Sequence, residues 1–132
     1  MRRIMAMLSA MTVMVVLTAG VAFAADIDCL IDACVGTKGD DQIRGTENPE
    51  TISALAGNDF VFSRGGDDTI YGDRGKDNLL GGGGNDTIYA EDGNVDYIDC
   101  GEGQKDTVYY DVGIDTVTNC EVLDPPTTTP SV

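Results

Sequence analysis

The hydrophobic pattern of the chain changes sharply near residue 24. Before that point an uncharged apolar run covers residues 4–21, with Arg2-Arg3 ahead of it and Ala22-Phe23-Ala24 behind it. A basic start, an apolar run and a small-x-small end predict a secretory signal peptide over residues 1–24, cleaved before Ala25. An uncleaved membrane anchor is the alternative, because the run is just long enough to span a bilayer.

Beyond residue 35 one branched or leucine side chain recurs about every nine positions. Nine units cover residues 36–118, two of them (90–99 and 100–109) with one extra residue in the turn. Not counting that extra residue, their eighth positions are Ile43, Ile52, Val61, Ile70, Leu79, Ile88, Ile98, Val108 and Val117. An acid stands two residues before each of them: Asp41, Glu50, Asp59, Asp68, Asp77, Asp86, Asp96, Asp106 and Asp115. The fourth position is glycine in every unit except the second, which has Asn48. Glycine this frequent excludes a helix, so we expect a Gly/Asp turn followed by a three-residue strand, repeated nine times.

The units resemble the nonapeptide G-G-x-G-x-D-x-U-x of RTX-type (hemolysin-type) calcium-binding proteins, and GGGGNDTIY (81–89) is the most regular of them. The resemblance implies an all-β fold, a right-handed parallel β-roll in which two units make one coil and each unit stacks on the one two places away. It also implies several Ca²⁺ ions between stacked turns, held by acid side chains and turn carbonyls. The implied metal-site residues are Asp41, Glu50, Asp59, Asp68, Asp77, Asp86, Asp96, Asp106 and Asp115, with Gly57, Gly66, Gly75 and Gly84 in the turns.

Elementary chemistry supports calcium between stacked turns. Calcium takes six to eight oxygens, more than one turn supplies. Two carboxylates stacked about 4.8 Å apart repel by about 0.9 kcal/mol even in water, and a divalent cation reverses that sign. We therefore expect folding to be coupled to calcium, with Asp59/Asp77 and Asp68/Asp86 as the strongest pairs. Three units depart from the pattern: Asn48-Pro49-Glu50 replaces Gly-x-Asp in one, and the turns 93–96 and 103–106 each contain an extra residue.

The charge balance narrows the partners and the chemistry. Removing the first 24 residues leaves six basic against 23 acidic residues, a net charge of −17. Such a chain repels nucleic acid and anionic lipid, so we expect neither nucleic-acid binding nor membrane binding after signal cleavage. The chain has no histidine, which excludes a Ser-His-Asp triad and an H-E-x-x-H zinc helix. We therefore predict a secreted, extracellular protein that is not an enzyme.

The four cysteines fit disulfides in a secreted chain. Of three possible connectivities we favour Cys29–Cys34 and Cys100–Cys120, because each closes a short local loop at one end of the repeats. A four-cysteine zinc site is the alternative, although the second spacing is too wide for a zinc knuckle. The expected organisation is an N-terminal cap over 25–35, the roll over 36–118, a C-terminal cap over 119–123 and a disordered tail over 124–132.

The outward positions of the strands carry two kinds of side chain. On the even-numbered units they form a threonine row beside a tyrosine row, which fits cross-strand support of a sheet. On the odd-numbered units they include Phe60, Phe62, Leu80 and Tyr97, a candidate face for a partner. The alternative function is therefore an adhesin-like interaction module that binds a cell-surface or glycan partner, with calcium only structural.

Overall fold

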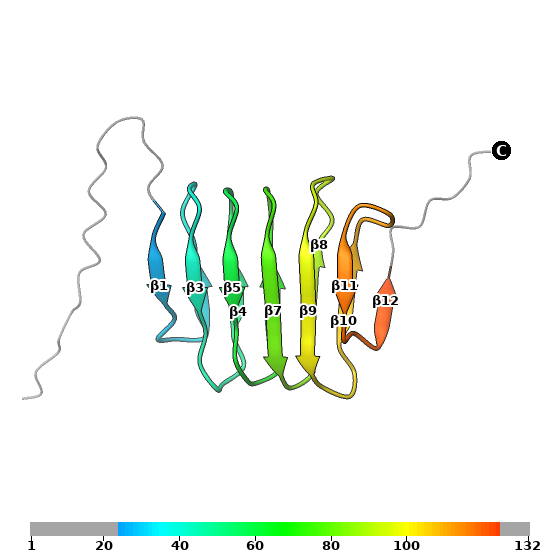
Figure 1. Ribbon diagram of the computed structural model, residues 1–132. Coiled ribbons are helices and arrows are strands. Elements are labelled where there is room, and N and C mark those ends of the chain that lie inside the picture. The colour runs from blue at the N-terminus through cyan, green and yellow to red at the C-terminus, as the bar shows by residue number, and fades with distance from the viewer. Residues whose placement is uncertain (1–23, 125–132) are drawn as a thin grey trace, which may run out of the picture.

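The computed structural model describes residues 24–124, which form twelve strands in two six-stranded sheets and contain no helix. One sheet has the order β1-β3-β5-β7-β9-β11 and the other β12-β10-β8-β6-β4-β2 (Figure 1). The first sheet contains β1 (Asp26–Asp28), β3 (Gln42–Arg44), β5 (Phe60–Phe62), β7 (Asn78–Gly83), β9 (Tyr97–Glu102) and β11 (Thr116–Thr118). The second contains β2 (Ala33–Val35), β4 (Thr51–Ser53), β6 (Thr69–Tyr71), β8 (Thr87–Ala90), β10 (Thr107–Tyr110) and β12 (Val122–Asp124).

Each strand pairs in parallel with the strand two places along the chain, as the nine-residue period predicts. Ile43 lies beside Val61, and Val61 beside Leu79, while Ile52 lies beside Ile70 in the opposite sheet. The chain therefore winds as a parallel β-roll, one strand of each sheet per coil. The roll is longer than the nine repeats, because β1, β2 and β12 continue the same pairing at its ends.

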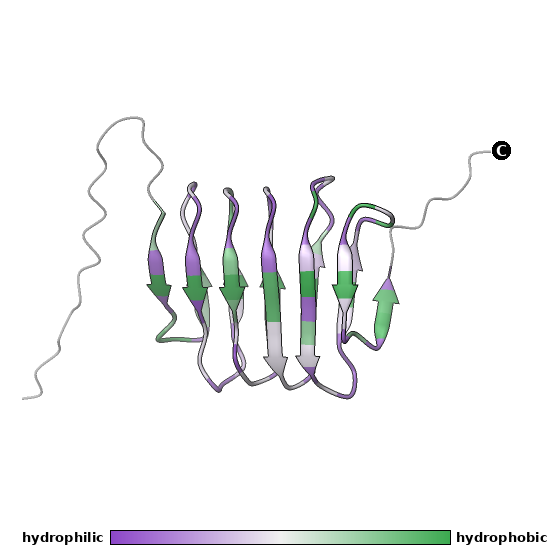
Figure 2. Cartoon of the chain, in the orientation of Figure 1, coloured by the Kyte–Doolittle hydropathy of each residue, from purple (hydrophilic) through white to green (hydrophobic). Residues whose placement is uncertain are grey.

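A thin apolar core runs along the axis of the roll. The eighth-position side chains point inward as predicted, and those from Ile43 to Val108 are fully buried. Their apolar bands repeat at the same height on successive strands in Figure 2. In the second to eighth units the first position is also buried and carries a small residue, such as Ala54, Ser63 and Ala90, whereas the ninth unit begins with the half-buried Tyr110. The nine-residue period of the branched residues does not reveal this second inward position. Its residue is small because a carbonyl oxygen of the next coil approaches it, as at Gly45 and Gly81.

The ends of the roll are closed by disulfide-linked segments. Cys29 is bonded to Cys34 and Cys100 to Cys120, the two pairs favoured from the sequence. Cys34 takes an inward position beside Ile52, and Leu123 lies in register with Val108. Asp124, assigned to the tail from the sequence, is instead the last residue of β12, because its strand continues the register of β10.

Two predicted segments fall on residues that the structure does not describe. The signal peptide lies outside the described residues except for Ala24, and the tail lies outside them from residue 125 onward. Within the described range, no helix is long and apolar enough to cross a membrane.

Candidate metal sites

The repeated acids lie in two rows, one along each line of turns. In Figure 1 these lines form the rows of loops above and below the sheets. The odd-unit row contains Asp41, Asp59, Asp77, Asp96 and Asp115, and the even-unit row contains Glu50, Asp68, Asp86 and Asp106. All are at most 5% exposed except Asp115, which is half-buried. Burying so many carboxylates is unfavourable unless each is paired or hydrogen-bonded.

In every aspartate of the two rows, one carboxylate oxygen accepts from a backbone N–H of the preceding coil, whereas Glu50 accepts only from Thr46 of its own turn. On the odd row, the N–H of Asp41 donates to Oδ1 of Asp59 at 2.7 Å, and the N–H of Asp59 donates to Oδ1 of Asp77 at 2.8 Å. The even row repeats this pattern, with the N–H of Asp68 donating to Oδ1 of Asp86 at 2.9 Å. These bonds fix the orientation of each carboxylate and join successive coils.

The second oxygen of five of these acids has no hydrogen-bond donor. The atoms are the buried Oδ2 atoms of Asp59, Asp68, Asp77, Asp86 and Asp106. A buried carboxylate oxygen without a partner carries a desolvation penalty, and a cation removes that penalty. The unpaired oxygens therefore fit a metal ion between the turns.

Main-chain carbonyls lie beside the same carboxylates. A β-carbon added at Gly81 would lie 2.5 Å from Oδ2 of Asp86 and 2.6 Å from the carbonyl oxygen of Cys100. The two oxygens thus approach the same small residue from successive coils. A β-carbon at Gly75, which has φ +140°, would collide with the carbonyl oxygen of Gly57. Glycine lets these turns approach closely enough to share a ligand.

The electrostatics of the rows favour a bound cation. Burial, together with repulsion from neighbouring acids, raises the pKa of Asp59, Asp68 and Asp96 to about 6. At the centre of each row, burial raises the pKa of Asp77 and Asp86 to about 7. The desolvated carboxylates therefore bind protons more readily than ordinary aspartates when no metal is present.

Main-chain oxygens must supply most of the ligands. Within residues 24–124, no three Asp, Glu or Cys side chains converge as a metal-binding group. One carboxylate from each of two turns, completed by carbonyls, gives an all-oxygen set. Calcium, a hard cation with six to eight oxygen ligands, suits such a set.

Comparison with known families agrees with this geometry. The family model of the RTX calcium-binding nonapeptide repeat matches residues 44–79 and 71–94, with four copies. This chain is an RTX-type repeat protein. The matched residues include the acids from Glu50 to Asp86. No curated protein and no solved structure matches the chain significantly.

The RTX repeats make the protein a calcium-binding β-roll, and their family is a structural calcium-binding family rather than an enzymatic one. The four glycines expected in the turns, Gly57, Gly66, Gly75 and Gly84, all have positive φ, between 104° and 140°. The second residue of two repeat units also has a positive φ although it is larger than glycine: φ is 77° at both Leu55 and Arg64. These two side chains strain RTX turns in which the consensus has glycine.

The acids near the ends of the rows differ from those at the centre, because their oxygens are not left buried without a hydrogen-bond donor. The first two acids fold back onto their own turns: Asp41 accepts from the N–H and hydroxyl of Thr37, and Glu50 accepts from the N–H and hydroxyl of Thr46. At the other end, Asp115 accepts from the N–H groups of Asp96 and Asp111 through its two oxygens. Asp96 accepts from Asp77, and its second oxygen is not among the unpaired ones.

Two features were missed from the sequence. Glu121 extends the even row, since its Oε2 accepts from the N–H of Asp106 at 2.9 Å. It stands two residues before Leu123, so the acid-to-apolar spacing of the repeat could have identified it.

The second feature is a row of side chains at the fifth position of the units, where the consensus specifies no residue. Asp67 accepts from the N–H of Asn85 at 2.8 Å, and the side chain of Asn85 accepts from the N–H of Gln104 at 3.3 Å. These hydrogen bonds also join turns of successive coils.

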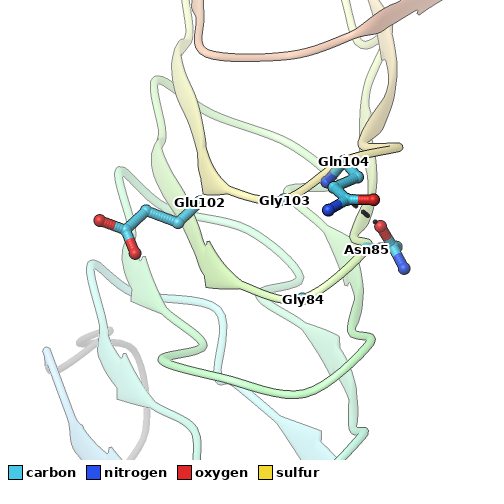
Figure 3. Close-up of a pocket in the computed structure, with 5 residues that line it drawn as sticks. All are labelled: Gly84, Asn85, Glu102, Gly103 and Gln104. Carbon is cyan, nitrogen blue, oxygen red and sulfur yellow. Dashed lines mark hydrogen bonds between the residues drawn. The ribbon is translucent and has the colours of Figure 1, made fainter.

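Figure 3 shows the part of this fifth-position row that borders an open hollow on the even-unit line of turns. Gly84, Asn85, Glu102, Gly103 and Gln104 line the hollow. Asn85 and Gln104 lie together, whereas the Glu102 side chain points away from both. Glu102 is exposed and lies outside the acid rows, which makes it a suitable control for mutagenesis.

Proposed function

We propose that the protein is a secreted β-roll that binds several Ca²⁺ ions between its stacked turns and whose folding is coupled to that binding. The observation that carries the proposal is the set of five buried carboxylate oxygens without donors, repeated at the coil spacing on both rows. Each is the second oxygen of a carboxylate whose first oxygen is already fixed. Such a carboxylate is oriented before the ion arrives.

The central residues of each row would hold the ions. On the odd row these are Asp59 and Asp77, and on the even row Asp68 and Asp86, joined there by Asp106. Their Oδ2 atoms, with carbonyls of the adjacent turns, would ligate calcium, which supplies the positive charge that the buried carboxylates lack. The residues at the row ends, Asp41, Glu50 and Asp115, have their oxygens engaged by N–H and O–H donors. We therefore assign them to closing the rows.

Coupling of folding to calcium follows from the balance between the core and the acid rows. One inward aliphatic side chain per unit contributes about 2 kcal/mol of burial, whereas ordering each residue costs about 1–2 kcal/mol. The buried acids add repulsion, and their pKa values of about 6–7 mean that several are ionised at neutral pH. Metal binding would then contribute directly to the free energy of folding.

Calorimetric titration of chain 25–132 with calcium tests this proposal, with circular dichroism recorded at each step. We expect several binding events and a rise in strand signal. Asp59→Asn with Asp68→Asn should weaken binding in both rows by roughly tenfold or more, and Glu102→Gln should leave the titration unchanged. Full strand content in chelator, or binding that is insensitive to the paired substitution, would refute the assignment.

Secretion is supported by the two disulfides, which persist in oxidising compartments. The predicted signal peptide supports the same location. Recovery of the processed chain from culture medium, with both disulfides intact, is the test. Retention of the full chain in the cytoplasm with free thiols would contradict this location.

A second candidate function rests on the outer face of the first sheet. Phe60 and Tyr97 are 41% and 42% exposed, and Phe62, 37% exposed, lies in register with Leu80. These four side chains cross β5, β7 and β9. A cell-surface or glycan partner bound here would make the protein an adhesin-like module with structural calcium. Replacing Phe60 and Phe62 by Ser should then abolish surface binding without changing calcium affinity, and unchanged surface binding would reject this function.

A further inference from the structure

The first residue of the predicted mature chain is fixed at the start of the odd acid row. Ala25 stands two residues before Ile27, at the position where the repeats carry their acid. Its nitrogen donates to Oδ1 of Asp41 at 2.9 Å, and its carbonyl oxygen accepts from the N–H of Gln42 at 2.7 Å. Ala25 therefore lies in the ladder of the roll and donates to the first carboxylate of the row.

Asp41 is a buried carboxylate surrounded by neutral donors. It is 2% exposed, and besides Ala25 it accepts from the N–H of Thr37 at 2.5 Å and from its hydroxyl at 2.9 Å. Among the described residues, both ion pairs belong to Arg44, which binds Asp26 and Asp28, so no basic side chain pairs with Asp41. The next acid of the row, Asp59, adds negative charge nearby. A positive charge placed at the nitrogen of Ala25 would therefore interact favourably with the end of this row.

We propose that hydrolysis of the Ala24–Ala25 peptide bond converts the nitrogen of Ala25 into an ammonium group that pairs with Asp41 and locks the first coil of the roll. The reaction adds water across the peptide bond, leaving a carboxylate on Ala24 and an ammonium on Ala25. A signal-type endopeptidase that cuts after small residues would catalyse it. Ala24 is exposed and precedes β1, so its removal leaves every strand intact.

The new charge changes the first coil without requiring a new contact. A hydrogen bond between an ammonium and a carboxylate is about twice as strong as one between neutral groups. The amide of the precursor and the ammonium of the processed chain occupy the same place, so the processed chain gains charge at an existing bond. The precursor should therefore fold less stably than the mature chain.

The experiment compares three forms of the chain at saturating calcium. One begins at Ala25 with a free amine, the second is the same chain with its α-amine acetylated, and the third retains Ala24. Acetylation keeps the N–H donor and removes only the charge. Each form is also made with Asp41→Asn, and with Asp28→Asn as a control that removes an exposed charge of the same sign near the terminus. Thermal unfolding gives stability, and amide hydrogen exchange locates the change.

We expect the free-amine chain to melt about 4–8 °C above the acetylated and extended forms. The difference should disappear with Asp41→Asn and persist with Asp28→Asn. Slower exchange should be confined to β1 and β3. If Asp41→Asn prevents folding, the comparison of the free and acetylated chains still decides.

Equal melting temperatures, or a difference that survives Asp41→Asn, would overturn the proposal, as would a mature N-terminus other than Ala25 by mass spectrometry. Because the comparison is made within one calcium condition, its failure leaves calcium binding intact. A flat calorimetric titration with calcium, in contrast, would reject the proposed function and leave the ion pair standing.

Discussion

Replacing Asp77 by Asn should change the stability of the roll in opposite directions with and without calcium. Asp77 is 2% exposed, its Oδ1 accepts from the N–H of Asp59 at 2.8 Å, and its Oδ2 has no donor. Burial, with added repulsion from Asp96 and Asp59, raises its pKa from 3.8 to about 7. Asparagine keeps the acceptor oxygen and removes the charge.

The magnitude follows from that pKa. A rise of about three pH units corresponds to about 4 kcal/mol at 1.36 kcal/mol per unit. Since the acid row runs along the edge of a thin roll, solvent screening reduces this to about 2 kcal/mol. At pH 8 in chelator, Asp77→Asn should therefore raise the melting temperature by about 8–16 °C or, where the wild type is unfolded, restore strand signal. At saturating calcium it should lower stability, because one charged ligand is lost, and weaken binding at that site roughly tenfold or more.

The assay is thermal unfolding followed by circular dichroism, in chelator and in calcium, with Glu102→Gln as the control. The control should shift stability little and in the same direction under both conditions. If Asp77→Asn is destabilising in chelator as well as in calcium, the carboxylate is not a desolvated metal ligand, and the reasoning from the unpaired oxygen fails.

Four further predictions address the pH dependence, the turns and a disulfide. The folded-state pKa of the buried acids is raised to about 6–7, so the calcium-free protein should be most stable below pH 4 and lose stability as the pH rises towards 7. The check is unfolding in chelator across this pH range, and stability that increases with pH would contradict the burial argument. Arg64→Gly should relieve the backbone strain of φ +77° and raise the free energy of unfolding in calcium by up to about 1 kcal/mol. Arg64→Ala keeps the β-carbon and should give no such gain. Equal melting temperatures for the two variants would show that Arg64 does not strain the turn. Gly75→Ala should be strongly destabilising because its new β-carbon meets the carbonyl oxygen of Gly57. Gly93 has open space around it, so Gly93→Ala should show only the cost of a positive φ. Comparable drops in melting temperature for the two variants would contradict the close approach of the turns at Gly75. Replacing Cys100 and Cys120 by Ser should lower stability by about 3 kcal/mol in denaturant unfolding, since the bond closes a loop of 20 residues, and an unchanged midpoint would exclude that role.

The period of the sequence predicted much of this fold, because the repeat fixes the register. An acid followed two residues later by an inward aliphatic residue determines which strands pair and which side chains enter the core. The same rule extends to Glu121 and Leu123, although the surrounding sequence has lost its glycines. The repeat pattern did not reveal that Asp41 and Glu50 fold back onto Thr37 and Thr46, because the consensus has glycine, which lacks a side chain, at the position of these threonines.

The candidate sites were predictable as rows but not as individual occupants. Identical consensus positions differ in the structure because the donors around them differ: Oδ2 of Asp86 has none, whereas both oxygens of Asp115 accept N–H groups. The fifth-position row through Asn85 was also hidden, because the consensus leaves that position free and only stacking brings successive side chains together. Local pattern therefore identifies the acids, and the hydrogen bonds between coils determine which of them remain available for a cation.

The central claim is that the buried carboxylates hold calcium and that this binding folds the roll. The most direct measurement is the strand signal of chain 25–132, followed by circular dichroism as calcium is added to the chelated protein, with magnesium as the comparison ion. We predict a cooperative gain of strand signal with calcium and little with magnesium, which takes fewer oxygens in a stricter geometry. Full strand signal before calcium is added, or the same response to both ions, would contradict the account.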